Sequence, residues 1–148
     1  MTLNDVVEAV NERLVLRWPD RTVYLDVCPV DFQRPGFWLR DIRGRQEILT
    51  PFLVRRTLSL ELVIYDEVDD HYEASALRLM EDGAAVFDLL APPLRAGDRF
   101  VTLTVEALGR EPDAAFFALS GEWLDDRPGA EDPEGGPLME EFHVTVNP

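Results

Sequence analysis

Hydrophobic residues near the start of the chain recur at the spacing of one helical face. The residues concerned are Leu3, Val6, Val7, Val10 and Leu14. This period predicts a helix from about Thr2 to Leu16. Thr2 is followed three residues later by Asp5, a spacing that resembles a capping box at the helix start.

Alternating and β-branched segments predict five strands after this helix. We expect them over residues 22–27, 37–43, 53–65, 100–108 and 114–124. The longest segment, Leu53–Tyr65, places four aliphatic side chains on one face and is expected to be a central strand. In residues 37–43, simple alternation places Trp38 and Arg40 on the face opposite to Leu39.

A second helix is expected between these strands. Asp69 or Asp70 can cap it, and Pro92 and Pro93 end it after Leu90. The strands at 37–43 and 53–65 form a long hairpin that projects beyond the sheet, with its turn at Gly44 or at Thr50-Pro51. Residues 109–113 read as the loop of an antiparallel hairpin.

The end of the chain has a different composition. Asp125–Pro137 is rich in Pro, Gly and acids and is expected to be a flexible acidic linker. Leu138–Val146 is expected to form a final strand, which can complete its own sheet or join a neighbour's sheet edge.

A length of 148 residues fits a single domain spanning 1–148. The fold class expected is α+β, with a mainly antiparallel mixed sheet, two helices packed on it and the projecting hairpin. The one cysteine, Cys28, lies in an apolar run and is expected to be a buried thiol in a reducing compartment. No signal peptide or membrane-spanning segment is predicted, so we expect a soluble protein.

Charge is distributed unevenly along a chain whose net charge is −15. Residues 1–60 hold nine Arg against eight acids, whereas residues 61–148 hold five against twenty-one. Six arginines lie close together in the sequence: Arg34, Arg40, Arg43, Arg45, Arg55 and Arg56. Opposite potentials on one molecule favour head-to-tail docking of copies, so these six are the candidate interface of an oligomer. The alternative is that the arginines line a strand face that is exposed to solvent and binds no partner.

Residue patterns for catalysis are absent. His71 and His143 have no partner at ligand spacing, and no phosphate-binding or hydrolase motif occurs. The acids of residues 66–70 lack the calcium-loop pattern and are expected to offset a helix dipole. We therefore expect no enzyme activity, no metal and no cofactor. The acidic charge also argues against specific nucleic-acid binding.

Three segments carry a resemblance to a known family. They are W-P-D-R-T-V-Y at Trp18–Tyr24, F-Q-R-P-G-F-W-L at Phe32–Leu39 and R-R-T-L-S-L-E-L-V-I-Y at Arg55–Tyr65. With the order of elements, they resemble the tail terminator proteins of long-tailed bacteriophages and prophages over about residues 2–124. The resemblance implies a structural virion protein that forms a ring, expected to be a hexamer, caps the tail tube, stops its polymerisation and provides the joint to the head.

The same resemblance implies three partners: other copies of the chain, the tail-tube protein and the head-tail connector protein, with DNA passing through the ring lumen. It implies a place in the neck region of the virion tail and, during assembly, in the bacterial host cytoplasm. One alternative is a head-completion or head-tail connector subunit. Another, from a different class, is an acidic nucleic-acid mimic that inhibits a DNA-binding protein.

Overall fold

The computed structural model describes residues 1–129 of the chain. The elements are α1 (Leu3–Arg17), β1 (Thr22–Leu25), β2 (Gly36–Ile48), β3 (Leu53–Tyr65), α2 (Ala76–Leu90), β4 (Leu94–Ala96), β5 (Arg99–Val101), β6 (Thr104–Glu111) and β7 (Ala114–Asp126). Five strands form one sheet in the order β1-β2-β3-β7-β6, in which only the β1–β2 pair is parallel. Strands β4 and β5 form a small separate hairpin. The predicted α+β class is confirmed.

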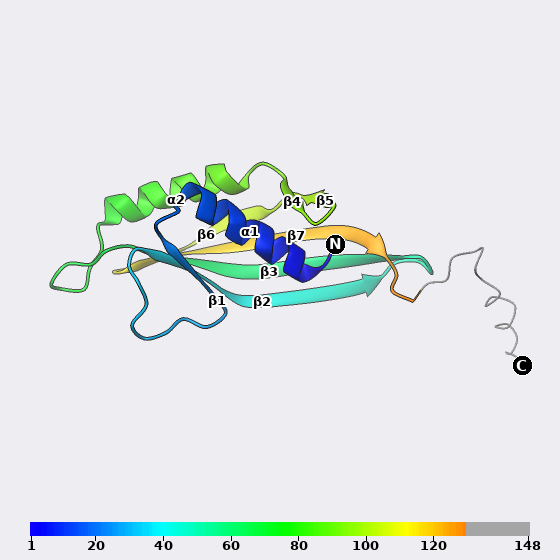
Figure 1. Cartoon of the computed structure of the whole chain (residues 1–148), viewed down its shortest axis with the longest axis horizontal. Coiled ribbons are helices and arrows are strands. Elements are labelled where there is room, and N and C mark those ends of the chain that lie inside the picture. The colour runs from blue at the N-terminus through cyan, green and yellow to red at the C-terminus, as the bar shows by residue number, and fades with distance from the viewer. Residues whose placement is uncertain (130–148) are drawn as a thin grey trace, which may run out of the picture.

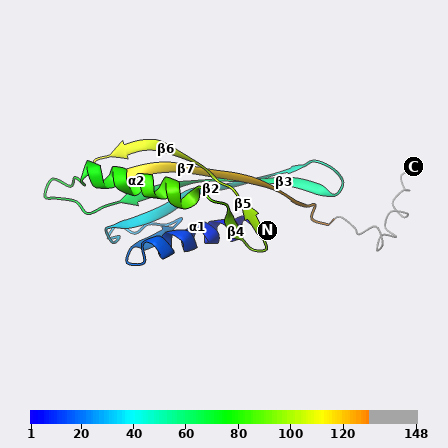
Figure 2. The same cartoon turned by 90° about the horizontal axis from the view of Figure 1, so that it is seen from above.

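Both helices lie on one face of the sheet (Figures 1 and 2). The core between them takes in Val6, Val10 and Leu14 of α1, Leu79, Val86 and Leu90 of α2, and Leu58, Leu60, Leu62 and Ile64 of β3. The four β3 residues are the aliphatic face predicted from the sequence, and the strand is central as expected. The opposite face of the sheet is covered by neither helix (Figure 1).

Helix α1 begins as its sequence predicts. The Thr2 hydroxyl accepts a hydrogen bond from the Asp5 backbone N–H, and the Asp5 carboxylate accepts one from the Thr2 backbone N–H. These bonds satisfy two N–H groups that the first helical turn leaves unpaired. At the other end, Trp18 caps the helix, and its ring lies 5.0 Å from that of Phe37 on β2.

Helix α2 begins later than predicted, at Ala76 with Ser75 as its N-cap. The prediction that Asp69 or Asp70 caps it is wrong. The Asp69 carboxylate instead accepts the backbone N–H groups of His71 and Glu73, which holds residues 69–73 in a tight loop. Tyr72 has a positive φ of 62° in this loop, so the backbone there cannot continue a right-handed helix.

The β2–β3 hairpin turns at Thr50, not at Gly44. The Thr50 hydroxyl accepts the backbone N–H groups of Phe52 and Leu53, while Gly44 lies inside β2 opposite Leu58. The hairpin extends past β1 and β6, and β7 stays paired with β3 as far as Leu53 (Figure 1). The projection therefore has three strands, and we call it the tongue. It consists of β2 from Arg43 to Ile48, β3 from Leu53 to Ser59 and β7 from Ser120 to Asp126.

Four other boundaries differ from the prediction. The first strand ends at Leu25, and Cys28 lies half-exposed in the loop beyond it, so the prediction of a buried thiol is wrong.

The segment 100–108 is divided between β5 and β6, because the turn at Gly97, with φ of 63°, folds β5 back onto β4. Strand β6 continues to Glu111. Asp125 and Asp126 belong to β7 and not to a linker, while the predicted final strand at 138–146 lies outside the described residues.

Candidate assembly surface

A β-bulge in β2 decides which way the arginines of this strand face. Arg40 pairs with Glu61 and Arg43 pairs with Ser59, so β2 has one more residue than β3 between these pairs. Asp41 in the bulge has a φ of 55°. Because side chains of a strand alternate between faces, the extra residue reverses the alternation beyond this point.

The consequence is a row of arginines on one face. Without the bulge, Arg43 and Arg45 would share the helix-covered face with Leu39. With it, Arg43 lies beside Ser59 and Arg45 beside Thr57, on the uncovered face that also carries Arg40. The simple alternation expected for residues 37–43 did not include this change of faces. In the sequence, the bulge is indicated only by Asp41, because Asp is one of the residue types that tolerate a positive φ.

Arg43 and Arg45 are the arginines of this row most available to a partner. The Arg43 side chain is 74% exposed and lies 3.8 Å from the Asp41 carboxylate, a long contact across an exposed pair. Arg45 is exposed and makes no ion pair within residues 1–129. Exposed pairs of this kind contribute at most about 1 kcal/mol, so the intramolecular contact of Arg43 does not compete strongly with a partner's carboxylate.

Arg40 and Arg55 lie on the same face but have partners within the chain. The Arg40 Nε donates to Glu61 Oε1 at 2.6 Å, and its guanidinium lies over the rings of Trp38 and Phe116. Arg55 donates to Glu47 at 2.8 Å and lies 3.9 Å from Glu122. These two residues hold the sheet face together before any neighbour arrives.

Arg56 lies on the helix side of the tongue. Its Nε is 3.4 Å from Asp125 Oδ2, and the same carboxylate lies 3.3 Å from the amino group of Met1 and 3.6 Å from Arg99. Burial raises the pKa of Asp125, but the backbone N–H of Asp126, the amino group of Met1 and Arg99 together lower it by more, so the net pKa is lowered. Arg56 and its neighbour Arg55 therefore point to different environments, although the sequence grouped them.

Arg34 is enclosed within the fold. Its guanidinium donates to the Asp113 carboxylate at 2.8 Å and to the backbone oxygen of Asp66 at 3.2 Å, and only 14% of the side chain is exposed. It also lies over the rings of Phe32, Tyr65 and Tyr72. Arg34 thus joins β2, the loop before α2 and the β6–β7 turn, and the structure does not bring it to the surface row.

The edge of β2 is open along the tongue. Strand β1 pairs only with Gly36–Leu39, so no strand within residues 1–129 pairs with the outer edge of β2 between Arg40 and Ile48. Unpaired strand edges present backbone N–H and C=O groups to any strand that approaches. The tongue therefore combines an exposed basic row with an open edge.

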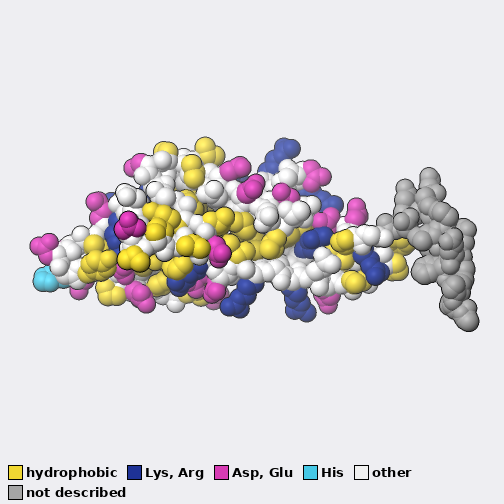
Figure 3. All heavy atoms as spheres, turned by 60° about the horizontal axis from the view of Figure 1, so that its bottom comes forward, with side chains coloured by type: hydrophobic (Ala, Val, Ile, Leu, Met, Phe, Trp, Pro, Cys, Tyr) yellow, Lys and Arg dark blue, Asp and Glu magenta, His cyan; other side chains and the backbone are white. Residues whose placement is uncertain are grey.

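The charges of the surface follow this arrangement. In Figure 3, basic side chains gather toward the tongue half of the molecule and acidic side chains are spread over the view. The loop before α2, at the other end, exposes Glu67, Asp69, Asp70 and Glu73. The two ends thus differ in charge: acids predominate in the loop before α2, whereas the tongue carries arginines together with acids such as Glu47 and Glu122.

Other residues with metal-binding or reactive side chains lie apart from the arginine row. Within residues 1–129, no group of three or more His, Cys, Asp or Glu could hold a metal ion. Burial raises the pKa of the Cys28 thiol, with nearby Arg34 opposing the shift, and His71 lies exposed in the loop before α2. Neither α1 nor α2 has the length and apolar character needed to cross a bilayer.

Comparisons with known proteins do not assign a family. No family model and no curated protein matches the chain. Nine solved chains match. One of them is 16% identical over 86% of this chain and 96% of its own length, with a TM-score of 0.43, a likeness too weak to carry an argument about function.

Proposed function

We propose that this chain is a structural virion assembly protein, a ring-forming tail terminator that caps the tail tube, stops its polymerisation and provides the joint to the head. The proposal starts from the resemblance of the three segments between Trp18 and Tyr65. The observation that carries it furthest is the row of Arg40, Arg43 and Arg45 on an uncovered sheet face, aligned there by the bulge.

The protein acts by binding neighbouring surfaces and blocking further addition of tube subunits. Guanidinium groups bind carboxylates through paired hydrogen bonds. Within residues 1–129, Arg43 has only the 3.8 Å contact with Asp41, and Arg45 makes no ion pair. An acidic surface of the next copy, or of the tube, supplies carboxylates to both. Contacts between unlike patches of identical copies close into a ring when the rotation allows, and a hexamer is the proposed closure. A ring whose far side differs from the tube's growing end offers no place for another tube subunit.

The partners follow from this role. One face of the ring binds the last layer of tail-tube protein, and the other binds the head-tail connector protein. The site of action is the neck region of the virion, after assembly in the host cytoplasm. The lumen passes DNA without specific binding, in keeping with a net charge of −15.

A charge reversal of the two exposed arginines tests the proposal. We expect Arg43→Glu with Arg45→Glu to raise the dissociation constant of ring formation or tube docking at least tenfold while the monomer stays folded, because each loses an intermolecular pair and gains a repulsion. The matched control is Arg95→Glu on β4, an exposed arginine away from the uncovered face. Light scattering measures the oligomer, and electron microscopy measures the length of tubes polymerised with each variant.

Two results would contradict the proposal. One is a wild-type protein that leaves tube length unregulated. The other is a protein that binds portal or connector protein but not the tube's end, which would instead indicate a head-completion subunit.

A further inference from the structure

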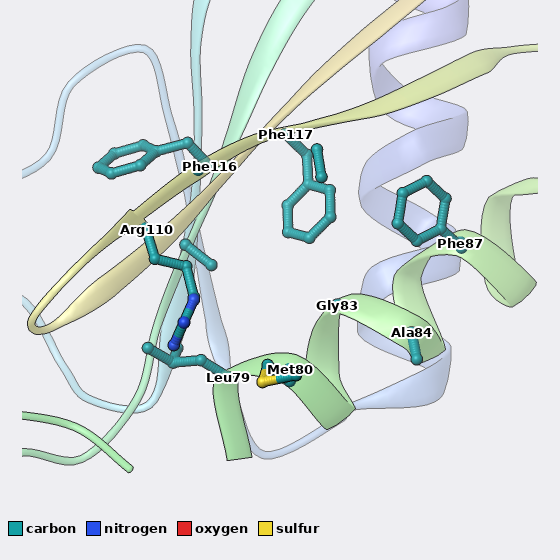
Figure 4. A pocket seen from close by; sticks show the side chains of 11 residues that line it. Leu79, Met80, Gly83, Ala84, Phe87, Arg110, Phe116 and Phe117 are labelled. Atoms are coloured by element: carbon teal, nitrogen blue, oxygen red, sulfur yellow. The ribbon is translucent and has the colours of Figure 1, made fainter. Parts of the chain in front are cut away.

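An apolar cavity of about 360 Å³ lies between α2 and the β6–β7 hairpin (Figure 4). These elements lie at the end of the molecule remote from the tongue (Figure 1). Met80, Gly83, Ala84 and Phe87 of α2 line one side, and Phe117 of β7 lies across from them. We call this cavity the α2 pocket. Its volume is in the range of ligand pockets, and its lining is almost entirely apolar.

Small residues on α2 create the hollow. A Cβ atom on Gly83 would lie 2.8 Å from Phe117 Cζ, so only glycine lets the helix come this close to the ring. The rings of Phe87 and Phe117 meet edge to face at 5.6 Å and form the floor. Met80 and Phe87 remain 58% and 39% exposed, so this apolar surface faces solvent in a single copy.

A second apolar surface lies at the tip of the tongue. Ile48 and Phe52 are 56% and 55% exposed, and Leu49 and Leu53 are exposed beside them. The Thr50 hydroxyl satisfies two backbone N–H groups of the turn, so the tip presents side chains and few unpaired polar groups. An aromatic side chain at the end of a rigid tongue is the kind of anchor that fills pockets at protein interfaces.

The tip and the α2 pocket of one copy cannot meet each other. Ala115 at the pocket pairs with Ile64, whereas Val54 is next to the tip. These two positions of β3 are separated by about 33 Å of extended strand. Any contact between tip and pocket therefore joins two copies.

Charges around the two surfaces are complementary. Arg43, Arg45 and Arg55 stand on the tongue behind the tip. The tongue also carries exposed acids, but Glu47 and Glu122 lie beside Arg55, which leaves Arg43 and Arg45 as its most available charges. Around the α2 pocket, exposed acids outnumber the arginines: Glu73, Glu81, Asp88 and Glu111 stand against Arg78 and Arg110. Complementary potentials of this kind orient approaching molecules and fix which ends meet.

We propose that the tongue tip of one copy, residues 48–53, inserts Phe52 into the α2 pocket of a second copy. Because tip and pocket are different surfaces, the contact is head-to-tail and repeats around a ring. The inference deepens the proposed function and rests on it for the closure of the ring, but the contact itself can be tested without tube protein.

Disulfide cross-linking tests the contact in the full-length chain. The background is Cys28→Ser, which removes the half-exposed native thiol. Phe52→Cys in one chain and Ala84→Cys in another, both at exposed positions, are mixed and oxidised. We expect a dimer from the mixture and a ladder of oligomers from one chain that carries both substitutions. Leu16→Cys, 80% exposed on α1, replaces Ala84→Cys in the matched control and should give at least tenfold less cross-linked product.

Three results would overturn the inference. A Phe52→Cys chain that dimerises with itself as readily as with Ala84→Cys would show a symmetric contact between tips. An internal disulfide between Ala84→Cys and Phe142→Cys at high dilution would show that the chain's own end fills the pocket. Absence of any product between positions 52 and 84, together with an Ala84→Arg chain that keeps Phe52 and associates as tightly as the wild type, would show that the two surfaces do not meet.

Substitutions that place a charge in the contact test this inference independently of the proposed function. We expect Phe52→Glu or Ala84→Arg, with the native Cys28, to raise the dissociation constant between copies at least tenfold. If the cross-linked ladder forms but tube length stays unregulated, the tip contact holds and the terminator function fails. If Phe52→Glu caps tubes as the wild type does and no ladder forms, the tip contact fails alone.

Discussion

The guanidinium of Arg56 lies 3.4 Å from the carboxylate of Asp125, across two neighbouring strands of the tongue. Asp125 also lies within 4 Å of Arg99 and the amino group of Met1, so one carboxylate joins β3, the β4–β5 hairpin and the start of the chain. Asp125 pairs with Val54 beside the tip, so these contacts fasten the outer part of the tongue to the helix side of the domain.

Removing this carboxylate should weaken the fold in a pH-dependent manner. We expect Asp125→Asn to lower the free energy of unfolding by about 1 kcal/mol at pH 7, the scale of partly exposed ion pairs. Because the folded-state pKa of Asp125 is lowered, its contribution is present above pH 3.8 and is lost as pH falls through the lowered value. Urea unfolding at pH 7 and in acid measures this, with Asp126→Asn as the control. Equal stability of variant and wild type at pH 7 would contradict it.

Asp82 on α2 should show the opposite pH dependence. Burial raises its pKa, a hydrogen bond from Arg21 at 3.1 Å lowers it, and the neighbouring carboxylate of Asp66 raises it, for a net increase. Asp66 is 1% exposed and its Oδ2 accepts no hydrogen bond, so a protonated Asp82 carboxyl has an acceptor there. The unfolded chain loses this proton near pH 3.8 and the folded chain at a higher pH, so stability from this group falls as pH rises across that interval.

Asp82→Asn should therefore remove that pH-dependent loss. At pH 7 we expect the variant to be at least as stable as the wild type, because the amide is neutral, can still accept from Arg21 and can donate to Asp66. Thermal unfolding between pH 3 and pH 7 measures the difference, with Asp88→Asn on the exposed side of α2 as the control. A destabilisation above about 1 kcal/mol at pH 7 would show that the ion pair with Arg21 dominates.

The bulge at Asp41 can be tested through its backbone. A φ of 55° suits glycine, is tolerated by aspartate and is strained for a β-branched residue. We expect Asp41→Val to lower the free energy of unfolding by about 1–2 kcal/mol, whereas Asp41→Gly stays within about 0.5 kcal/mol of the wild type. Urea unfolding compares the two. Equal stability of both variants would show that the bulge does not need this conformation.

Arg34 should affect stability and not assembly directly. Lysine cannot reproduce the planar fork that reaches Asp113 and the Asp66 backbone oxygen while lying against three aromatic rings. We expect Arg34→Lys to lower the free energy of unfolding by about 1–2 kcal/mol, and Arg45→Lys, at an exposed site, to leave it unchanged. Oligomer dissociation constants that change for Arg34→Lys while unfolding does not would instead place Arg34 at an interface.

Local patterns predicted the parts of the fold that depend on neighbours in the sequence. The capping box at Thr2, the end of α2 before Pro92, and the whole of β3 from Leu53 to Tyr65 are all as expected. Helix caps and side-chain alternation involve residues a few positions apart, so the sequence shows them directly. The α+β class follows from the same signals.

Other features depended on contacts between distant segments. Helix α2 begins only after Ser75, because the backbone N–H of Ala74 donates to the carbonyl oxygen of Pro112 in the β6–β7 turn and not to a helical partner. Arg34 does not belong to the exposed arginine row, because it pairs with Asp113, which lies 79 residues later in the sequence. Neither partner can be identified from the sequence around the residue itself.

The sequence by itself determined the fold class, the central strand and the concentration of six arginines in residues 34–56 of an acidic chain. Only the tertiary structure decided where those arginines point. One extra residue in β2 reversed the faces beyond Arg40, and Arg56, which shares the helix-covered face of β3 with Leu58, meets Asp125 there. The physical reason is that a strand's register is fixed by the strand beside it, and a single-residue shift moves every later side chain to the opposite face.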